Sequence, residues 1–319
     1  MKKIAILTSG GDAPGMNACI RACVRSALNK GLEVYGVDRG YKGLVENNLF
    51  PMSTNSVCDI IHRGGTILKT ARCLEFKDPA TRKIAADNLK KLGIEGLVVI
   101  GGDGSFTGAK ALSDEQGINV VGIPGTIDND LAYTDYTLGF DTAVNTVLWA
   151  INALRDTMTS HDRVCLVKVM GRHCGDIALY SGICGGAEYI LVPEVPYDIQ
   201  KIAEGIKENK AHGKTASVIV LAEGAGNENE IKTVVSVISG SDVKITTLGH
   251  IQRGGSPTMA DRMLAAKFGV KAIDLLISGK TDKVVGIRGQ KVFDMDITEA
   301  LSKKKTIDKE LYDMASYLC

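Results

Sequence analysis

The stretch VVGIPGTIDNDL, residues 120–131, joins an apolar run to a loop that carries two aspartates. The first four residues have the composition of a buried strand, and Pro124-Gly125 ends it. Asp128 and Asp130 follow two residues apart, so in an extended loop they would face the same side. An unpaired buried charge is costly. The two acids are therefore solvated turn residues, ligands of a cation, or a pair of which one accepts a proton.

Apolar runs of this kind recur along the chain, and helical stretches separate them. Polar loops follow the runs, namely TSGGDAPG, GGDGS, PGTIDND, MGRHCGD, AEGAG and LGHIQRGG. The expected helices include residues 17–29, a segment that Asp78-Pro79 starts and Gly93 ends, and a long helix capped by Asp141. This alternation predicts an α/β fold of two doubly wound, three-layer domains with largely parallel sheets.

The expected domains are interleaved in sequence. The larger one comprises residues 1–139 and 257–304, and the smaller one comprises residues 140–256 and 305–319. Ligands of open α/β sheets bind at the carboxyl ends of the strands. We therefore expect the active site in the cleft between the two domains.

Composition argues against several classes of protein. The 38 Lys and Arg residues nearly balance 37 Asp and Glu residues, so non-specific binding to nucleic acid or anionic membrane is not indicated. No apolar run approaches the length of a membrane span, and MKKIAILTSGG has too few apolar residues for a signal peptide. The eight cysteines form no CxxC pair, which disfavours a disulfide framework or zinc site. We expect a cytoplasmic protein.

Two glycine-rich loops are candidate anion sites. SGGDAPGMN (9–17) and GGDGS (101–105) each join a strand to a helix, where glycine lets backbone N–H groups approach an anion. The alternative is a plain tight turn. Asp103 in the second loop suits magnesium bound to phosphates, or else it caps a helix. The chain has no GxxxxGK[ST] and no GxGxxG, so neither a P-loop nor a standard dinucleotide fingerprint is supported.

Cationic side chains accompany the polar loops. They are Arg72, Arg163, Arg172, Arg253 and His250. The planar, always charged fork of arginine suits anionic oxygens. An ordinary surface position is the alternative for any single one, but their coincidence with the loops favours an anionic ligand.

Together these motifs resemble the bacterial ATP-dependent 6-phosphofructokinase family. The similarity runs from Lys3 to the C-terminus through TSGGDAPGMN, RGGT (63–66), GGDGS, PGTIDND, VMGRHCGD and LGHIQRGGSP. It implies a glycolytic kinase that uses ATP to phosphorylate the 1-hydroxyl of fructose 6-phosphate. It also implies a homotetramer with sites shared between subunits, in which the larger domain binds ATP and the smaller one binds the sugar phosphate.

The resemblance assigns roles to individual residues. Asp128 would be the general base, while Asp103 and Asp130 would hold Mg²⁺. The catalytic set also includes Thr126, Arg172, Gly11 and Arg72. The ATP-binding set is Gly11, Tyr41, Arg72, Cys73, Gly102, Asp103, Gly104 and Ser105. The sugar-phosphate set is Thr126, Ile127, Asp128, Arg163 from a neighbouring subunit, Met170, Gly171, Arg172, Glu223, Lys244, His250, Ile251, Gln252 and Arg253.

A regulatory site for ADP or phosphoenolpyruvate is also implied. Its expected residues are Arg21, Ala22, Cys23, Val24, Arg25, Asp59, Arg155, Gly186, Ala187, Glu188, His212 and Lys214. From the sequence alone, the spacing of Arg21 and Arg25 favours an ordinary solvated helix face, and the regulatory role rests on the resemblance.

This chain departs from the family pattern at the regulatory site and at the sugar-phosphate site. Thr54 stands where an arginine is common, and His212, Thr215 and Ala216 replace parts of a basic cluster. We therefore expect weak regulation. Lys244 replaces a second cross-subunit arginine, and lysine lacks its bidentate geometry, so substrate affinity is expected to be lower.

Two other functions remain open from the sequence. The pyrophosphate-dependent branch typically has an aspartate at the position of Gly104 and a lysine at that of Gly125. An aspartate at 104 would repel the α-phosphate of a nucleotide, so the sequence favours ATP. A non-catalytic sugar-phosphate-binding sensor would need neither a metal-binding acid nor a base.

Overall fold

Two β-sheets organise the chain, each in its own unit. The computed structural model describes residues 1–318. Unit 1 comprises residues 1–127, 131–142 and 253–304, and unit 2 comprises residues 128–130, 143–252 and the chain from Lys305 onward. Apart from the short excursion at residues 128–130, the chain changes unit after positions 142, 252 and 304, where the expected boundaries were 139, 256 and 304. The expectation did not separate Asp128–Asp130 from the strand before it.

Unit 1 contains a seven-stranded sheet of order β11-β10-β5-β4-β1-β2-β3. Its strands are β1 (Lys3–Thr8), β2 (Glu33–Val37), β3 (Leu49–Met52), β4 (Gly96–Gly101), β5 (Asn119–Pro124), β10 (Lys283–Arg288) and β11 (Lys291–Asp296). The five inner strands are parallel, and β3 and β11 are antiparallel at the two edges. β4 is buried along its whole length, as a strand covered by helices on both faces should be. The predicted largely parallel α/β fold is confirmed.

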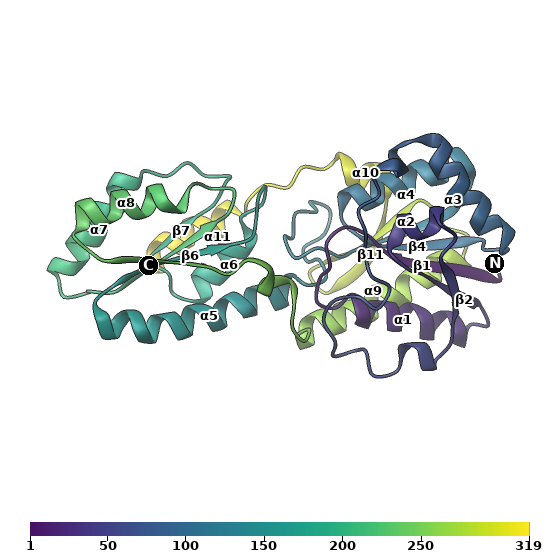
Figure 1. Ribbon diagram of the computed structural model, residues 1–319, viewed down its shortest axis with the longest axis horizontal. Helices are drawn as coiled ribbons and strands as arrows, with labels where there is room; N and C mark the ends of the chain where they lie inside the picture. Colours follow the sequence, from purple (N-terminus) through teal and green to yellow (C-terminus); the bar gives the residue numbers. More distant parts are fainter. Residues whose placement is uncertain (319) are drawn as a thin grey trace. The chain divides into compact units, whose positions relative to one another are not determined.

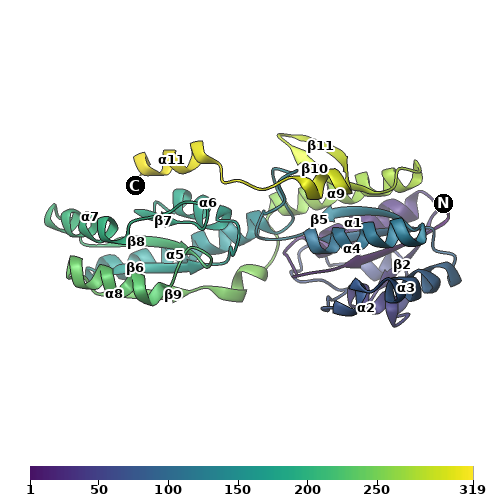
Figure 2. The ribbon, with the colours of Figure 1, turned by 90° about the horizontal axis from the view of Figure 1, so that it is seen from above.

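Helices cover both faces of this sheet (Figure 1). One face carries α1 (Met16–Asn29) and α9 (Met259–Ile277), and the other carries α2 (Gly40–Val45), α3 (Pro79–Lys91), α4 (Asp103–Gln116) and α10 (Ile297–Ser302). Figure 2 shows α4 in front of the sheet and α1 behind it. As predicted, α3 begins after Asp78, whose carboxylate accepts a hydrogen bond from Ala80 N at 3.0 Å. Gly93 follows the helix with a left-handed φ of 68°.

Unit 2 contains a four-stranded parallel sheet of order β7-β8-β6-β9. Its strands are β6 (Val164–Val169), β7 (Tyr189–Leu191), β8 (Ser217–Ala222) and β9 (Val243–Thr247). Its helices are α5 (Phe140–His161), α6 (Asp176–Cys184), α7 (Ile199–Ala211), α8 (Glu228–Ser239) and α11 (Lys309–Leu318). Figure 1 shows α7 and α8 along one face of this sheet and α5 along the other. No helix within residues 1–318 is long and apolar enough to cross a membrane.

The start of α5 differs from the prediction. The helix begins at Phe140, so Asp141 lies in its first turn and is not the cap. Asp261 of α9 takes that role, because its carboxylate accepts hydrogen bonds from Gly139 N at 2.8 Å and Thr142 N at 2.9 Å. Burial raises the pKa of Asp261 to about 6, and the hydrogen bonds from Thr142 and Gly139 oppose that rise. The partner lies 122 positions from Gly139, so no local pattern revealed it.

Replacing Asp261 with asparagine should destabilise unit 1. Asparagine has one acceptor oxygen in place of two, so a buried N–H at the start of α5 would face an amide donor, at a cost of about 1–3 kcal/mol. We expect a lower urea midpoint for Asp261→Asn by circular dichroism at about pH 8, where the native carboxylate is ionised. Asp114→Asn is the control, because it removes only an exposed ion pair with Lys110. Equal midpoints for the two variants would contradict this role.

Candidate functional site

Three loops of unit 1 begin side by side at the carboxyl ends of β1, β4 and β5. Ser9 N donates to Ile100 O at 2.9 Å, and Gly125 N donates to Gly101 O at 2.9 Å. These bonds extend the parallel ladders one residue past each strand. The loops TSGGDAPG, GGDGS and PGTIDND therefore start from neighbouring positions, as the sequence predicted.

The loop after β1 carries Gly11 and is covered by an arginine. Gly10 has a left-handed φ of 86°. A Cβ added to Gly11 would lie 2.3 Å from Arg253 Nη1, so a larger residue here would require this guanidinium to shift. Arg253 Nη1 also donates to Asp12 O at 3.3 Å. A glycine backbone beside a guanidinium is suited to an anion.

The loop after β4 leads directly into α4. Gly102 is the N-cap residue, and Asp103 is the first helical residue and is exposed, so the alternative in which Asp103 caps the helix does not hold. Cβ atoms added to Gly102 or Gly104 would have no heavy atom within 4 Å. The N-terminus of α4 therefore has open space beside it, and the N–H groups and the dipole at a helix N-terminus favour anions.

The expected ATP-pocket residues Tyr41 and Cys73 differ in exposure. Tyr41 is buried, and its hydroxyl donates to Ser105 O while its ring stacks on Phe76 with centroids 4.1 Å apart. Burial raises the pKa of Tyr41 far above its usual value. Tyr41 thus supports the GGDGS loop from the core. Cys73 is partly exposed, and Arg72 beside it is exposed.

The loop after β5 is not a simple extended segment. Asn129 has a left-handed φ of 52°, so the segment from Asp128 to Asp130 is not extended, and the same-side placement expected for an extended loop does not apply. Both aspartates are nevertheless half-buried, whereas Asn129 is buried. Asn129 Nδ2 donates to Asp176 Oδ2 at 2.9 Å, and Lys305 Nζ lies 2.9 Å from the same oxygen. This buried anchor fixes the residue between the two acids, and the sequence analysis missed it.

The same loop contains two further expected substrate residues. Thr126 is half-buried, whereas Ile127 is fully buried, so the side chain of Ile127 belongs to the core. Thr137 Oγ1 donates to Thr126 O at 2.6 Å, which ties this loop to the segment before α5.

A second group of expected site residues gathers at the carboxyl ends of β6, β8 and β9 in unit 2. Arg172 Nε lies 3.7 Å from Glu223 Oε1, and Glu223 N donates to Val169 O at 2.9 Å. Gln252 is fully buried, and its Oε1 accepts from Met170 N at 3.1 Å, so it supports the loop from behind. The expected residues Gly171, His250 and Ile251 lie on these same loops, and His250 and Ile251 are exposed.

Arg163 and Lys244 lie at the opposite ends of the same strands. Arg163 directly precedes β6, and Lys244 is the second residue of β9. β6 has six residues, which span about 20 Å. Both side chains contact Asp242, Arg163 Nε at 2.8 Å and Lys244 Nζ at 3.1 Å. Within one chain, therefore, these two cations do not join Arg172 and Glu223.

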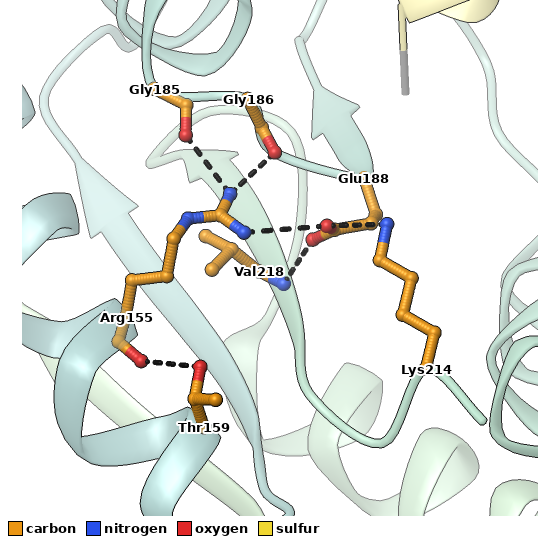
Figure 3. Close-up of polar contacts among 7 residues, drawn as sticks. All are labelled: Arg155, Thr159, Gly185, Gly186, Glu188, Lys214 and Val218. Carbon is orange, nitrogen blue, oxygen red and sulfur yellow. Dashed lines mark hydrogen bonds and ion pairs between the residues drawn. The ribbon is translucent and has the colours of Figure 1, made fainter.

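Three of the expected regulatory residues of unit 2, Arg155, Glu188 and Lys214, form one ion cluster (Figure 3). Arg155 Nη2 donates to Gly185 O at 2.9 Å and also to Gly186 O. The buried carboxylate of Glu188 lies 3.5 Å from Arg155 Nη1 and 2.8 Å from Lys214 Nζ. These side chains are therefore held in place by one another.

The other expected regulatory residues differ in their exposure to solvent. On α1, Cys23 and Val24 are fully buried, so Arg21 and Arg25 are the side chains that reach outward, as predicted. Asp59 and Gly186 are exposed, whereas Ala187 is buried. His212 ends α7, with its Nδ1 2.8 Å from Glu208 O.

Known proteins are similar to this chain over nearly its whole length. The family model described as Phosphofructokinase matches residues 3–276. The protein named ATP-dependent 6-phosphofructokinase from Clostridium botulinum (strain Hall) is 59% identical over 318 residues, which covers 100% of this chain and 99% of that relative. ATP-dependent 6-phosphofructokinase 1 from Clostridium perfringens (strain 13) is 60% identical over 316 residues, or 99% of each chain.

Solved structures agree with these matches. The phosphofructokinase from Saccharomyces cerevisiae has a TM-score of 0.88 and 35% identity, covering 100% of this chain and 47% of the yeast chain. A pyrophosphate-dependent phosphofructokinase from Marinobacter aquaeolei has a TM-score of 0.88 at 22% identity, which is a likeness of fold alone; it covers 97% of this chain and 86% of its own. The chain belongs to the phosphofructokinase family.

Proposed function

We propose that this chain transfers the γ-phosphoryl group of ATP to the 1-hydroxyl of fructose 6-phosphate, giving fructose 1,6-bisphosphate and ADP. The observation that carries the proposal is the 59% identity, over the full chain, with a protein named ATP-dependent 6-phosphofructokinase. The open space at Gly104 supports ATP over pyrophosphate as the donor, because a nucleotide needs room beside its α-phosphate. A sugar-phosphate sensor without catalysis is not favoured.

The loops of unit 1 would bind ATP. The N–H groups near Gly11 and at the start of α4 suit its phosphates, because both places offer backbone donors beside glycine. Arg72 would add a cation to the transferring group. Phosphoryl transfer asks the protein mainly for positioning and charge stabilisation, so rigid backbone donors are well matched to it.

Asp128 would act as the general base for the sugar hydroxyl. A positioned base contributes about 10²–10⁴-fold to a rate. The anchor of Asn129 on Asp176 and Lys305 fixes the backbone next to Asp128, which supports a defined orientation for its carboxylate. Thr126 and Arg172 would steady the reacting group, and the loops around Glu223 and His250 would bind the sugar.

Asp103 and Asp130 would hold Mg²⁺. Among residues 1–318, no group of three or more His, Cys, Asp or Glu side chains is arranged to hold a metal ion. Magnesium in kinases usually takes one or two carboxylates, with phosphates and water completing its shell. The exposed Asp103 beside the open positions of Gly102 and Gly104 fits that arrangement. When bound, the ion would neutralise charge on the phosphates.

Arg163 and Lys244 would bind the 6-phosphate of a sugar held by a neighbouring subunit. Their place at the far ends of β6 and β9 supports this assignment, because they lie a strand's length from Arg172 and Glu223. The assignment requires an oligomer with shared sites, and the homotetramer of the family is the form that we propose. The cluster of Arg155, Glu188 and Lys214 would belong to a regulatory site for ADP or phosphoenolpyruvate, and we expect the enzyme in the cytoplasm.

Replacing Asp128 with serine should remove the base with little loss of volume. We expect kcat to fall by about 10²-fold or more, while the KM for ATP changes little. A coupled assay of ADP release, with and without fructose 6-phosphate, measures both. Asp87→Asn on the exposed face of α3 is the control. A kcat within a few-fold of the unmodified enzyme would rule out the assignment.

Gly104→Asp should weaken the use of ATP far more than the use of pyrophosphate. The fold should tolerate the change, because the position is open and an acid suits the first turn of a helix. The measurement is kcat/KM for each donor. Gly104→Asn is the matched control, since it adds similar bulk without charge. Equal losses in the two variants would show that bulk, and not charge, decides the donor.

ADP and phosphoenolpyruvate should shift the fructose 6-phosphate saturation curve only weakly. A missing cation withholds a charge-assisted hydrogen bond of about 1.5–3 kcal/mol, equal to about one to two orders of magnitude in binding. Thr54→Arg should strengthen the response, because the turn after Thr54 packs against α1, which carries Arg21 and Arg25. Thr54→Gln is the uncharged control. Strong sub-millimolar regulation of the unmodified enzyme, abolished by Arg25→Ala, would contradict this expectation.

A further inference from the structure

Three charged side chains meet where two neighbouring strands of unit 2 begin. Arg163 directly precedes β6, and Asp242 directly precedes β9. The strands are parallel with Val164 opposite Val243, and Val164 N donates to Asp242 O at 3.1 Å. Asp242 and Lys244 flank the buried Val243, so both point to the exposed face of the sheet edge. The backbone ladder therefore places all three charges together.

One oxygen atom holds both cations. Asp242 Oδ2 lies 2.8 Å from Arg163 Nε and 3.1 Å from Lys244 Nζ. Two positive groups this close repel each other, and the carboxylate between them offsets that repulsion. The hydrogen bond from Lys244 lowers the pKa of Asp242, and the charge of Arg163 lowers it further. The carboxylate is thus ionised at neutral pH, where both cations are also charged.

These contacts leave donors available for another anion. Asp242 engages Arg163 through Nε, so the two Nη groups remain as a fork of the kind that binds phosphate in a bidentate manner. Lys244 has three N–H donors, and the contact uses one. The side chains of Arg163, Asp242 and Lys244 are 33%, 51% and 46% exposed, so the pairs add little to stability. The main effect of these ion pairs is therefore to hold the two cations in position.

We propose that Asp242 is a positioning residue that holds Arg163 and Lys244 together as a clamp for the 6-phosphate of the sugar. The inference rests on the proposed function, in which these two cations bind that phosphate. Lys244 increases the need for such a residue. Its flexible side chain carries a point charge, which does not define the geometry of phosphate binding as a planar guanidinium does. The two side chains are then already ordered before the substrate binds, so binding loses less conformational entropy.

The test is Asp242→Asn, which keeps the shape of the side chain and removes its charge. We expect the KM for fructose 6-phosphate to rise about tenfold, which corresponds to about 1.4 kcal/mol. The kcat and the KM for ATP should stay within about twofold, because the residue touches neither the reacting atoms nor ATP. Asp242→Glu keeps the charge, so this variant should retain much of the affinity of the unmodified enzyme for fructose 6-phosphate. Asp294→Asn, which breaks the ion pair of Lys271 with Asp294 at 2.7 Å, is the control.

A second comparison separates this inference from the function on which it rests. Lys244→Met should also raise the KM for fructose 6-phosphate. In the double variant Asp242→Asn/Lys244→Met, the loss of binding free energy should be smaller than the sum of the losses in the two single variants, because both residues act on one clamp. If Lys244→Met raises the KM but Asp242→Asn leaves it unchanged or lowers it, the positioning role is wrong and the phosphate assignment stands. If neither variant changes the KM of an active enzyme, the phosphate assignment and the clamp are both wrong.

Discussion

The parallel ladder of β1, β4 and β5 is the constraint on which the rest of unit 1 depends. The ladder continues past the strands through Ser9 N to Ile100 O and Gly125 N to Gly101 O, so three polar loops must start together. Gly101 permits this approach, because a Cβ there would lie 2.6 Å from Ser9 O. Backbone hydrogen bonds thus set the place of the glycines and acids before any side chain contributes.

Buried polar contacts then fix the loops that follow the ladder. Asp261 satisfies the N–H groups at the start of α5, and Asp176 with Lys305 anchors Asn129. Each contact joins segments that are distant in sequence, and each leaves its buried carboxylate with partners, as an interior charge requires. The proposed base Asp128 and the proposed metal ligand Asp130 therefore flank a residue whose side chain is anchored, which is the support that catalytic geometry needs.

Five of the cations proposed to bind anions already have carboxylate partners. Arg172 pairs with Glu223, Arg155 and Lys214 share Glu188, and Arg163 and Lys244 share Asp242. An incoming phosphate would meet side chains that are already ordered, which lowers the entropy cost of binding. It would also meet a carboxylate nearby, which weakens the net positive field. The balance of these two effects sets affinity at each place.

The sequence by itself determined the fold class, the main strands and helices, the loops at the strand ends and the family. These features follow from hydrophobic periodicity, from capping residues such as Asp78, and from motifs within a few residues of one another. Tertiary structure alone decided that Asp261 caps α5, that Asn129 adopts a left-handed conformation on Asp176, that Arg253 covers Gly11 and that Asp242 joins two cations. The physical reason is that a local pattern indicates which backbone and side-chain polar groups will need hydrogen-bond or ion-pair partners. Which residue becomes that partner depends on how distant segments pack together.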